Sequence, residues 1–384
     1  MFFKYFSKKR RIYLDFASRA VFGSSVGNPN ALHQEGLHEA ARLATARENI
    51  AKIIKVQPSE VVFTSGATES NNIALQGVVY GLLARGYKKE EIEIITSDIE
   101  HASISEVAQG LADRAGIVYT QITHTDGYVN PKDIVPSKNI RACIVSIIFV
   151  QNEIGSIQPI KEIAKRIRHV RKEFPETVFV LHTDATQAPL YIDLSVPSLG
   201  IDMMTVGSAK LPVQNGVGFL YIKKNTPMAP VYFGGGQEFG FRSGTQPVAL
   251  IEHFAHAVVA AQKMRASFAP HIQNLRDYFE TRIQESFPFI QISSIAGYRA
   301  PHISHLLIPH IDSELLVIEL DARGIAVSSQ SACSNDTEKH LPENLQPKNV
   351  ATLRVSFGST TKKRDIDRLV KAISQVLTKY NKSL

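Results

Sequence analysis

The chain has 384 residues, of which 44% are hydrophobic and 21% charged, with 43 lysines and arginines against 36 aspartates and glutamates. This length and composition predict a soluble globular protein of two or three domains and exclude a disordered chain. The longest apolar run, ACIVSIIFV at 142–150, is far shorter than the roughly 18 residues of a membrane-spanning helix, and two cysteines exclude a disulfide framework.

The charge pattern and the amino terminus suggest a cytoplasmic protein. The longest basic block is KKRR at 8–11, so the formal charge of +7 is expected to be mostly solvated surface, and no direct nucleic-acid site is predicted. The opening MFFKYFSKKRRIYLD places its aromatic residues before its charges, which is the reverse of a secretory signal.

Apolar runs rich in β-forming residues alternate with helical patterns through the first two thirds of the chain. Because the runs are nearly continuous rather than alternating in polarity, they are typical of strands buried on both faces, and we expect an α/β domain with a mainly parallel sheet. The predicted strands are 60–66, 91–98, 141–150, 177–184, 201–207 and 216–222, and the helical patterns between them include 69–86 and 160–174.

The pattern changes after about residue 248. A long helical stretch at 248–285 leads to ISHLLIPHID at 303–312, a helix-like segment at 313–324 and a strand at 351–358. A final amphipathic helix carries apolar residues on one face, and we predict a large domain at 12–250, a smaller α+β domain at 251–384 and an amino-terminal extension at 1–11. The apolar face comprises Ile366, Leu369, Val370, Ile373, Val376 and Leu377.

Polar residues follow five of the predicted strands, at their carboxyl ends. In open α/β sheets ligands bind at this edge, so the five clusters predict a single site. They are Ser65-Gly66-Ala67-Thr68, Glu100-His101, Gln151-Asn152-Glu153, Asp184 with Gln187, and Ser208-Ala209-Lys210.

Three of these clusters indicate one cofactor when they are taken together. SGATES at 65–70 opens a helix and is either a phosphate seat or a capping box. Asp184 ends an apolar strand, and because an unpaired buried carboxylate is costly it needs either a salt-bridge partner or a protonated ring nitrogen. Lys210 is either a solvated loop charge or a Schiff-base amine. A phosphate seat, an aspartate for a pyridinium nitrogen and an imine-forming lysine describe pyridoxal phosphate. The chain has no GxxxxGK[ST] loop and no GxGxxG after a strand, which disfavours a nucleotide.

The two cysteines lie in different surroundings. Cys143 falls inside an apolar run and is expected to be buried and inert, whereas Cys333 falls in the small polar segment SSQSACSNDT, and its role stays open on this evidence. No metal site is predicted.

The chain resembles a cysteine desulfurase of the NifS/IscS type, in the class-V aminotransferases of pyridoxal-phosphate fold type I, from about Ile12 to Leu377. The desulfurase assignment depends mainly on His101, the RSGT segment, Cys333 and Arg354. The matching stretches occur in family order: IYLDFAS, GNPNALHQEG, VVFTSGATESNN, EHASI, QNEIG, HTDATQ, SAK followed by NGVG, GGGQEFGFRSGT, SSQSACS and LRVSFG.

The resemblance implies a role for each matching residue. Lys210 would bind the cofactor and move the substrate α-proton, Cys333 would be the sulfur-accepting nucleophile, and His101 would stack on the cofactor ring and assist proton transfer. The cofactor would also contact Asp184 at its ring nitrogen, Gln187 at its phenolic oxygen, and Ala67, Thr68, Ser208 and a neighbouring subunit's Thr245 at its phosphate. Arg354 would bind the substrate carboxylate with Asn152 beside it.

The activity implied is conversion of L-cysteine to L-alanine by a homodimer that leaves a persulfide on Cys333. The sulfur would pass to an acceptor protein or thiol, for iron–sulfur cluster assembly or tRNA thiolation. The alternatives are a selenocysteine lyase or another class-V aminotransferase, or a degenerate fold kept as a non-catalytic scaffold.

The sequence departs from the family pattern around the lysine. The histidine usual before the lysine is Ala209, the serine usual two positions earlier is Gly207, and the Gly-Pro-Lys turn is replaced by VQN at 213–215. Arg19 also stands where a small residue is usual. Since a lost contact to a phosphate costs about 1.5–3 kcal/mol, we expect a weaker or differently anchored cofactor, with Ser208 covering part of the loss.

Overall fold

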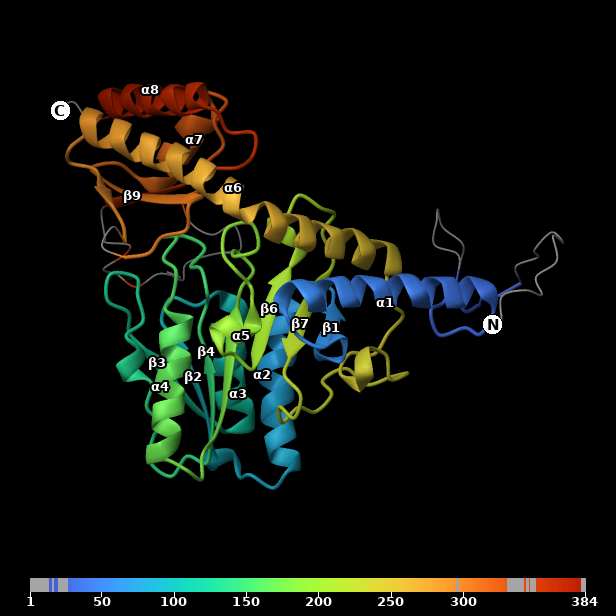
Figure 1. Ribbon diagram of the computed structural model, residues 1–384. Coiled ribbons are helices and arrows are strands. Elements are labelled where there is room, and N and C mark those ends of the chain that lie inside the picture. Colours follow the sequence, from blue (N-terminus) through green and yellow to red (C-terminus); the bar gives the residue numbers. More distant parts are fainter. Residues whose placement is uncertain are drawn as a thin grey trace.

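The computed structural model describes residues 14–15, 17–19, 27–294, 297–329, 342, 345 and 350–380. Figure 1 shows two units, a large one built on a central sheet and a small one beside it, joined by the long helix α6 (Val248–Ser286). Among the described helices, none is both long and apolar enough to cross a membrane.

The large unit is built on a seven-stranded sheet in the order β1-β7-β6-β5-β4-β2-β3. Strands β6, β5, β4, β2 and β3 run parallel, and β7 runs antiparallel to both of its neighbours. The bounds are β1 Val61–Thr64, β2 Ile92–Ser97, β3 Val118–Ile122, β4 Ala142–Ser146, β5 Val178–Asp184, β6 Met203–Gly207 and β7 Gly218–Ile222.

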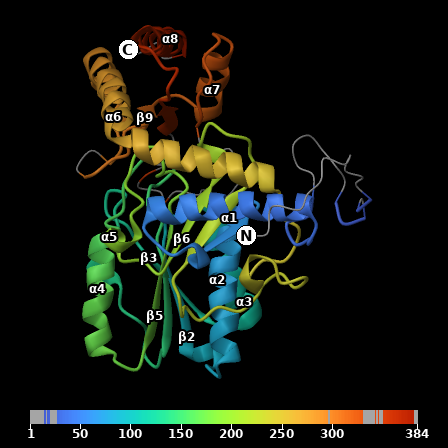
Figure 2. The ribbon, with the colours of Figure 1, turned by 45° about the vertical axis from the view of Figure 1, so that its right-hand side comes forward.

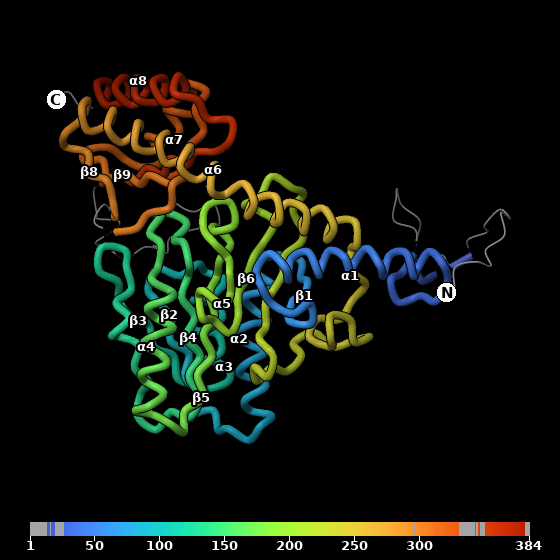
Figure 3. Tube along the Cα trace, viewed as in Figure 1, coloured from blue at the N-terminus to red at the C-terminus, as the bar shows by residue number. Residues whose placement is uncertain are grey.

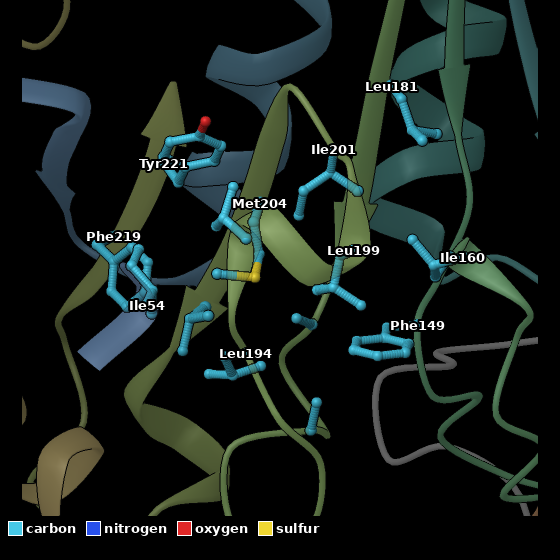
Figure 4. Packing of buried hydrophobic residues seen from close by; sticks show 14 of the residues in the cluster. Ile54, Phe149, Ile160, Leu181, Leu194, Leu199, Ile201, Met204, Phe219 and Tyr221 are labelled. Atoms are coloured by element: carbon cyan, nitrogen blue, oxygen red, sulfur yellow. The ribbon is translucent and has the colours of Figure 1, made fainter. Parts of the chain in front are cut away.

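Helices cover both faces of this sheet, which explains the near-continuous apolar runs. On one face, α1 (Gln34–Ile54), α4 (Ile160–Glu173), the short α5 (Val196–Leu199) and the first half of α6 pack on alternate strand residues. Figure 4 shows part of this core, with Phe149, Met204 and Phe219 among the labelled side chains. On the other face, α2 (Ala67–Ala84) and α3 (Ala102–Ala115) pack on the remaining strand residues.

The small unit has its own core around a three-stranded antiparallel sheet in the order β10-β9-β8. Its helix α8 buries all six apolar residues that the sequence places on one face, which confirms that prediction. The bounds are β8 Gln291–Ile292, β9 Ile303–Pro309, α7 Ser313–Asp321, β10 Val350–Ser356 and α8 Lys363–Tyr380.

Helix α6 belongs to both units. Its residues from Val248 to Ala261 lie in the core of the large unit, and those from Ile272 to Ile283 lie in the core of the small one. Pro270 lies between the two groups and removes one helical hydrogen bond there. The tube in Figure 3 and the turned view in Figure 2 both show α6 passing alongside α1 before it reaches the small unit.

The α/β fold and the mainly parallel sheet predicted from the sequence are confirmed, and each of the six predicted strands contains a strand of the sheet. Strand β3 was not predicted from the sequence. This strand lies at the edge of the sheet and is only partly buried, so its sequence VYTQI lacks the apolar run that marks the others.

Candidate functional site

A cavity of about 360 Å³ lies at the carboxyl edge of the large sheet. The residues to which the resemblance assigns a role all line it except Thr245, which is exposed elsewhere, and Cys333, which lies outside the described residues. Three residues of the predicted strand-end clusters do not line it: Glu100, Gln151 and Glu153. The predicted residues in its wall are Ala67, Thr68, His101, Asn152, Asp184, Gln187, Ser208, Lys210 and Arg354.

The first turn of α2 opens directly onto the cavity. Its N-cap residue is Gly66, so no cap side chain accepts hydrogen bonds from the first N–H groups of the helix. Gly66 has φ 155° and ψ −178°, a conformation that is nearly restricted to glycine, and an added Cβ would meet no atom within 4 Å. The capping-box alternative is therefore not formed here, and the free N–H groups with the helix dipole suit an anion.

Two glycines let the strands approach this helix terminus closely. Gly207 and Gly218 face each other in β6 and β7. A Cβ at Gly207 would lie 2.9 Å from the Ala67 nitrogen, and one at Gly218 would lie 2.9 Å from Gly66. Since these contacts are with backbone, neither position accepts a side chain without moving the start of α2.

Asp184 ends β5 with its carboxylate 5% exposed at the cavity wall. Its oxygens accept hydrogen bonds from the Asn71 amide at 2.7 Å, the Thr186 N–H at 2.9 Å and the Thr186 hydroxyl at 2.5 Å. Among the described residues, no lysine or arginine forms an ion pair with it. The salt-bridge alternative is therefore not realised, and the carboxylate is available to a cationic group of a ligand.

Asn71 links Asp184 to His101. Its amide nitrogen also donates to the Ser103 hydroxyl at 2.8 Å, and that hydroxyl lies 2.8 Å from His101 Nδ1. The Ser103 backbone N–H donates to the same Nδ1 at 3.1 Å, so Nδ1 is an acceptor and a neutral imidazole carries its proton on Nε2. His101 is therefore both the N-cap of α3 and part of the cavity wall.

A second carboxyl group lies behind the wall. Glu100 is 7% exposed and accepts hydrogen bonds from the Ser97 hydroxyl and from the Ile148 N–H at 2.9 Å, while its Oε2 has no partner among the described protein groups. Burial, with a smaller contribution from the nearby Asp184 charge, raises the pKa of Glu100 to about 8.

Two cationic side chains also line the cavity. The Arg354 guanidinium comes from β10 of the small unit and donates to the Asn152 carbonyl at 3.0 Å. Lys210 follows β6 in a single 3₁₀ turn and is exposed, so the protein chain alone leaves its amine in contact with solvent. Ser208 is 2% exposed and its hydroxyl lies 3.4 Å from the Val217 nitrogen.

Comparison with known proteins identifies the family to which the chain belongs. Residues 17–369 match the class-V aminotransferase family. The cysteine desulfurase IscS of Dictyoglomus turgidum is 31% identical over 97% of this chain and 95% of its own length. A solved NifS-like protein is 29% identical with a TM-score of 0.81, covering 92% of both chains, and SspA solved in complex with cysteine is 28% identical with a TM-score of 0.71, covering 87% and 91%.

The chain belongs to the cysteine desulfurases of the class-V aminotransferase family. The family assignment and the enzyme class predicted from the sequence are confirmed. The domain boundary at 250 and the role of each site residue stay predictions.

Several residues at this cysteine desulfurase site were not singled out from the sequence. Asn71 sits in the predicted ESNN helix start, and its position in the first turn of a helix at the site edge was the available signal. Ser103 lies just after the predicted His101, while His302 comes from the small unit, where no sequence signal connects it with this edge. Cys143 is 1% exposed, and burial raises its pKa, so the expected inert role agrees with its surroundings.

Proposed function

We propose that this cysteine desulfurase uses pyridoxal phosphate to convert L-cysteine to L-alanine and leaves the sulfur as a persulfide on Cys333. The observation that carries the proposal is Asp184, a buried carboxylate at the cavity wall that has hydrogen bonds but no cationic partner among the described residues. A protonated pyridine nitrogen supplies the missing charge, whereas a neutral ligand would leave the carboxylate uncompensated.

The other walls of the cavity suit the remaining groups of this cofactor. The uncapped start of α2, with Gly66 and Thr68, suits the phosphate, and the side chains of Gln187 and Ser208 would add contacts. Lys210 is the only described lysine in the cavity wall, so its amine would hold the cofactor covalently. When bound, the cofactor supplies an electron sink for the bonding electrons of the substrate α-carbon.

The chain's own residues would divide the remaining work. Arg354 would bind the substrate carboxylate, and the Lys210 amine would take the substrate α-proton. Asp184 would keep the proton on the ring nitrogen through its charge, and Asn71 and Thr186 would hold Asp184 in place. His101 would contact the ring with its Nε2–H free to move a proton.

Cys333 would act as a thiolate on the substrate sulfur. The S–S bond would form as the bond from the β-carbon to the sulfur breaks, and the organic product would be alanine. The persulfide would then pass to a thiol or protein acceptor for iron–sulfur cluster assembly or tRNA thiolation.

We further propose a homodimer in which Thr245 serves the cavity of the second copy. Thr245 is exposed and does not line the cavity of its own chain. Exposed aromatic side chains in the same segment, Tyr232 at 47%, Phe233 at 87% and Phe239 at 53%, fit a surface that another chain covers. A cytoplasmic location stays a prediction.

The Cys333→Ala variant tests the sulfur-transfer step. We expect it to release no sulfide from L-cysteine in the presence of a thiol reductant, with a loss of at least a hundredfold, while the cofactor band is retained. The Cys143→Ala variant is the matched control and should keep its rate, because Cys143 is buried away from the cavity. Undiminished alanine and sulfide release by Cys333→Ala would show that the persulfide does not form on this residue.

A further inference from the structure

The Gln187 side chain forms a hydrogen bond with a histidine of the small unit. His302, which immediately precedes β9, places its Nε2 3.2 Å from the Gln187 Oε1. His302 is 7% exposed, and its ring stacks on Tyr191 with 3.9 Å between centroids and 7° between planes. The contact therefore joins a large-unit side chain of the cavity wall to a rigid aromatic stack.

The unpartnered ring atom fixes the direction of this hydrogen bond. His302 Nδ1 is buried and has no partner among the described protein groups. A proton on Nδ1 would leave a buried donor unsatisfied, which is more costly than an unpaired lone pair, so the proton lies on Nε2. Burial, reinforced by Arg354, Arg276 and Lys210, lowers the pKa of His302 to about 3, so the ring is neutral at physiological pH.

This tautomer also fixes the orientation of the Gln187 amide. His302 Nε2–H needs an acceptor, which is the Gln187 Oε1. The Gln187 amide nitrogen is then left with its two N–H donors, and no group among the described residues accepts a hydrogen bond from them. An amide rotated by 180° would bring two donors together against His302, and it would present an oxygen rather than N–H groups to a ligand.

We propose that His302 is a positioning residue that holds the Gln187 amide with its N–H group available to the anionic phenolic oxygen of the bound cofactor. This inference rests on the proposed function. A neutral, stacked histidine suits the task because it donates one hydrogen bond in a fixed direction and brings no charge of its own to the site.

The small unit thereby contributes a second group to a site built on the large unit, beside Arg354. The stack continues from Tyr191 to Phe268, at 5.9 Å between centroids, two residues before Pro270 in α6. His302 also accepts a hydrogen bond at its carbonyl from the Phe357 N–H, next to the strand that carries Arg354. Its position is therefore tied to the same small sheet.

The test is a pH titration of the visible band of the cofactor held by Lys210, in the full-length holoenzyme. A hydrogen-bond donor to the phenolic oxygen stabilises the negative charge of that oxygen, so the proton on the neighbouring imine nitrogen is bound less tightly. Loss of the donor therefore raises the pH at the midpoint of the titration of the visible band. Among the described residues, the titratable groups facing the same cavity are Glu69, His101, Asp184, Lys210 and Arg354, and all stay in place in the variants.

His302→Phe keeps a ring against Tyr191 and removes the donor. We expect the midpoint to rise by about one pH unit, a tenfold change in proton binding. His302→Gln can place a donor near the Nε2 position and should return the midpoint to within a few tenths of a unit. If His302→Phe does not fold, His302→Asn, whose amide is too short to reach Gln187, is expected to give the same rise.

His305→Phe is the matched control. His305 lies in β9 three residues after His302, is 1% exposed, bonds the Ser293 hydroxyl at 2.8 Å and forms no hydrogen bond with Gln187. The variant should lower the Tm as His302→Phe does and leave the band midpoint unchanged. Gln187→Leu should raise the midpoint, and adding His302→Phe to it should cause no further rise.

The results separate this inference from the proposed function. An unchanged midpoint in His302→Phe, with a raised one in Gln187→Leu, would overturn the role of His302 and leave the proposed function standing. Equal rises in His302→Phe and His305→Phe would also overturn it, because a general distortion would then be the cause. A wild-type protein that gives no visible band with pyridoxal phosphate would overturn both.

Discussion

At the scale of single residues, Glu100 makes stability depend on pH in a direction opposite to the buried histidines. The pKa of Glu100 is about 8 in the folded protein, above the ordinary value of 4.5. Its contribution to the free energy of unfolding is therefore fully present below pH 4.5 and is lost as the pH rises toward 8. The pKa values of His182, His302 and His305 are lowered to about 4, 3 and 4, so their contributions are lost only as the pH falls below 6.5. Between pH 6.5 and 8 the effect of Glu100 stands alone among these four.

We therefore expect the stability of the cofactor-free protein to fall by about 2 kcal/mol between pH 6.5 and 8 through this carboxyl. In Glu100→Gln the amide oxygen keeps the acceptor role toward Ser97 and Ile148 without a charge, so the fall should largely disappear. The measurement is the Tm at several pH values. A slope in Glu100→Gln as steep as in the wild type would mean that Glu100 stays ionised in the folded protein.

The residues that the sequence could predict are those that end apolar strands. Asp184 ends β5, and Lys210 lies in the turn that follows β6. Parallel strands bring their carboxyl ends to one edge, so the proximity of these two residues follows from the order of the elements. His302 could not be found this way. It reaches Gln187 only because α6 carries the small sheet back to this edge, and that return depends on packing between units rather than on a local pattern.

At the scale of elements, β6 packs closely against the start of α2, and this contact determines whether a larger side chain fits at the two positions, 207 and 209, where the chain departs from the family pattern. At Gly207 a Cβ would lie 2.9 Å from the Ala67 nitrogen and 3.0 Å from the Ala67 Cβ, so a serine there must displace α2. Ala209 is exposed and lines the cavity, so a longer side chain has room. The two departures are therefore not equivalent.

The two substitutions toward the family pattern should have opposite effects on cofactor binding. Ala209→His adds a donor beside the proposed phosphate position, and we expect up to about tenfold tighter binding of pyridoxal phosphate. Gly207→Ser should weaken binding and lower the Tm, because the start of α2 must move. The measurement is the dissociation constant by equilibrium dialysis. Tighter binding in Gly207→Ser would contradict the close approach of β6 and α2.

The elements themselves differ in how well the sequence predicts them. Strands buried on both faces and the amphipathic α8 carry strong patterns, and the structure confirms them. The edge strand β3 was missed because half-buried residues give a weak pattern. From the sequence, SGATES could form either a capping box or a helix start with free N–H groups. The structure decides between these alternatives, because Gly66 is the N-cap residue and no side chain caps the helix.

At the scale of the whole molecule, the cavity needs both units. The large sheet and α2 supply the groups assigned to the cofactor, while Arg354 and His302 come from the small unit, whose core begins beyond Pro270 in α6. A change in the angle between the units would therefore alter the substrate contact and the hold on Gln187 together. The proposed second copy would add Thr245 from outside.

The absorption spectrum of the purified protein, with and without L-cysteine and beside Lys210→Ala, tests the central claim most directly. We expect a yellow band after incubation with pyridoxal phosphate, its loss in Lys210→Ala, and a shift of the band when L-cysteine is added, with alanine as the product. A wild-type protein that stays colourless after this incubation would contradict the account, because the cavity around Asp184 and Lys210 would then not hold the cofactor.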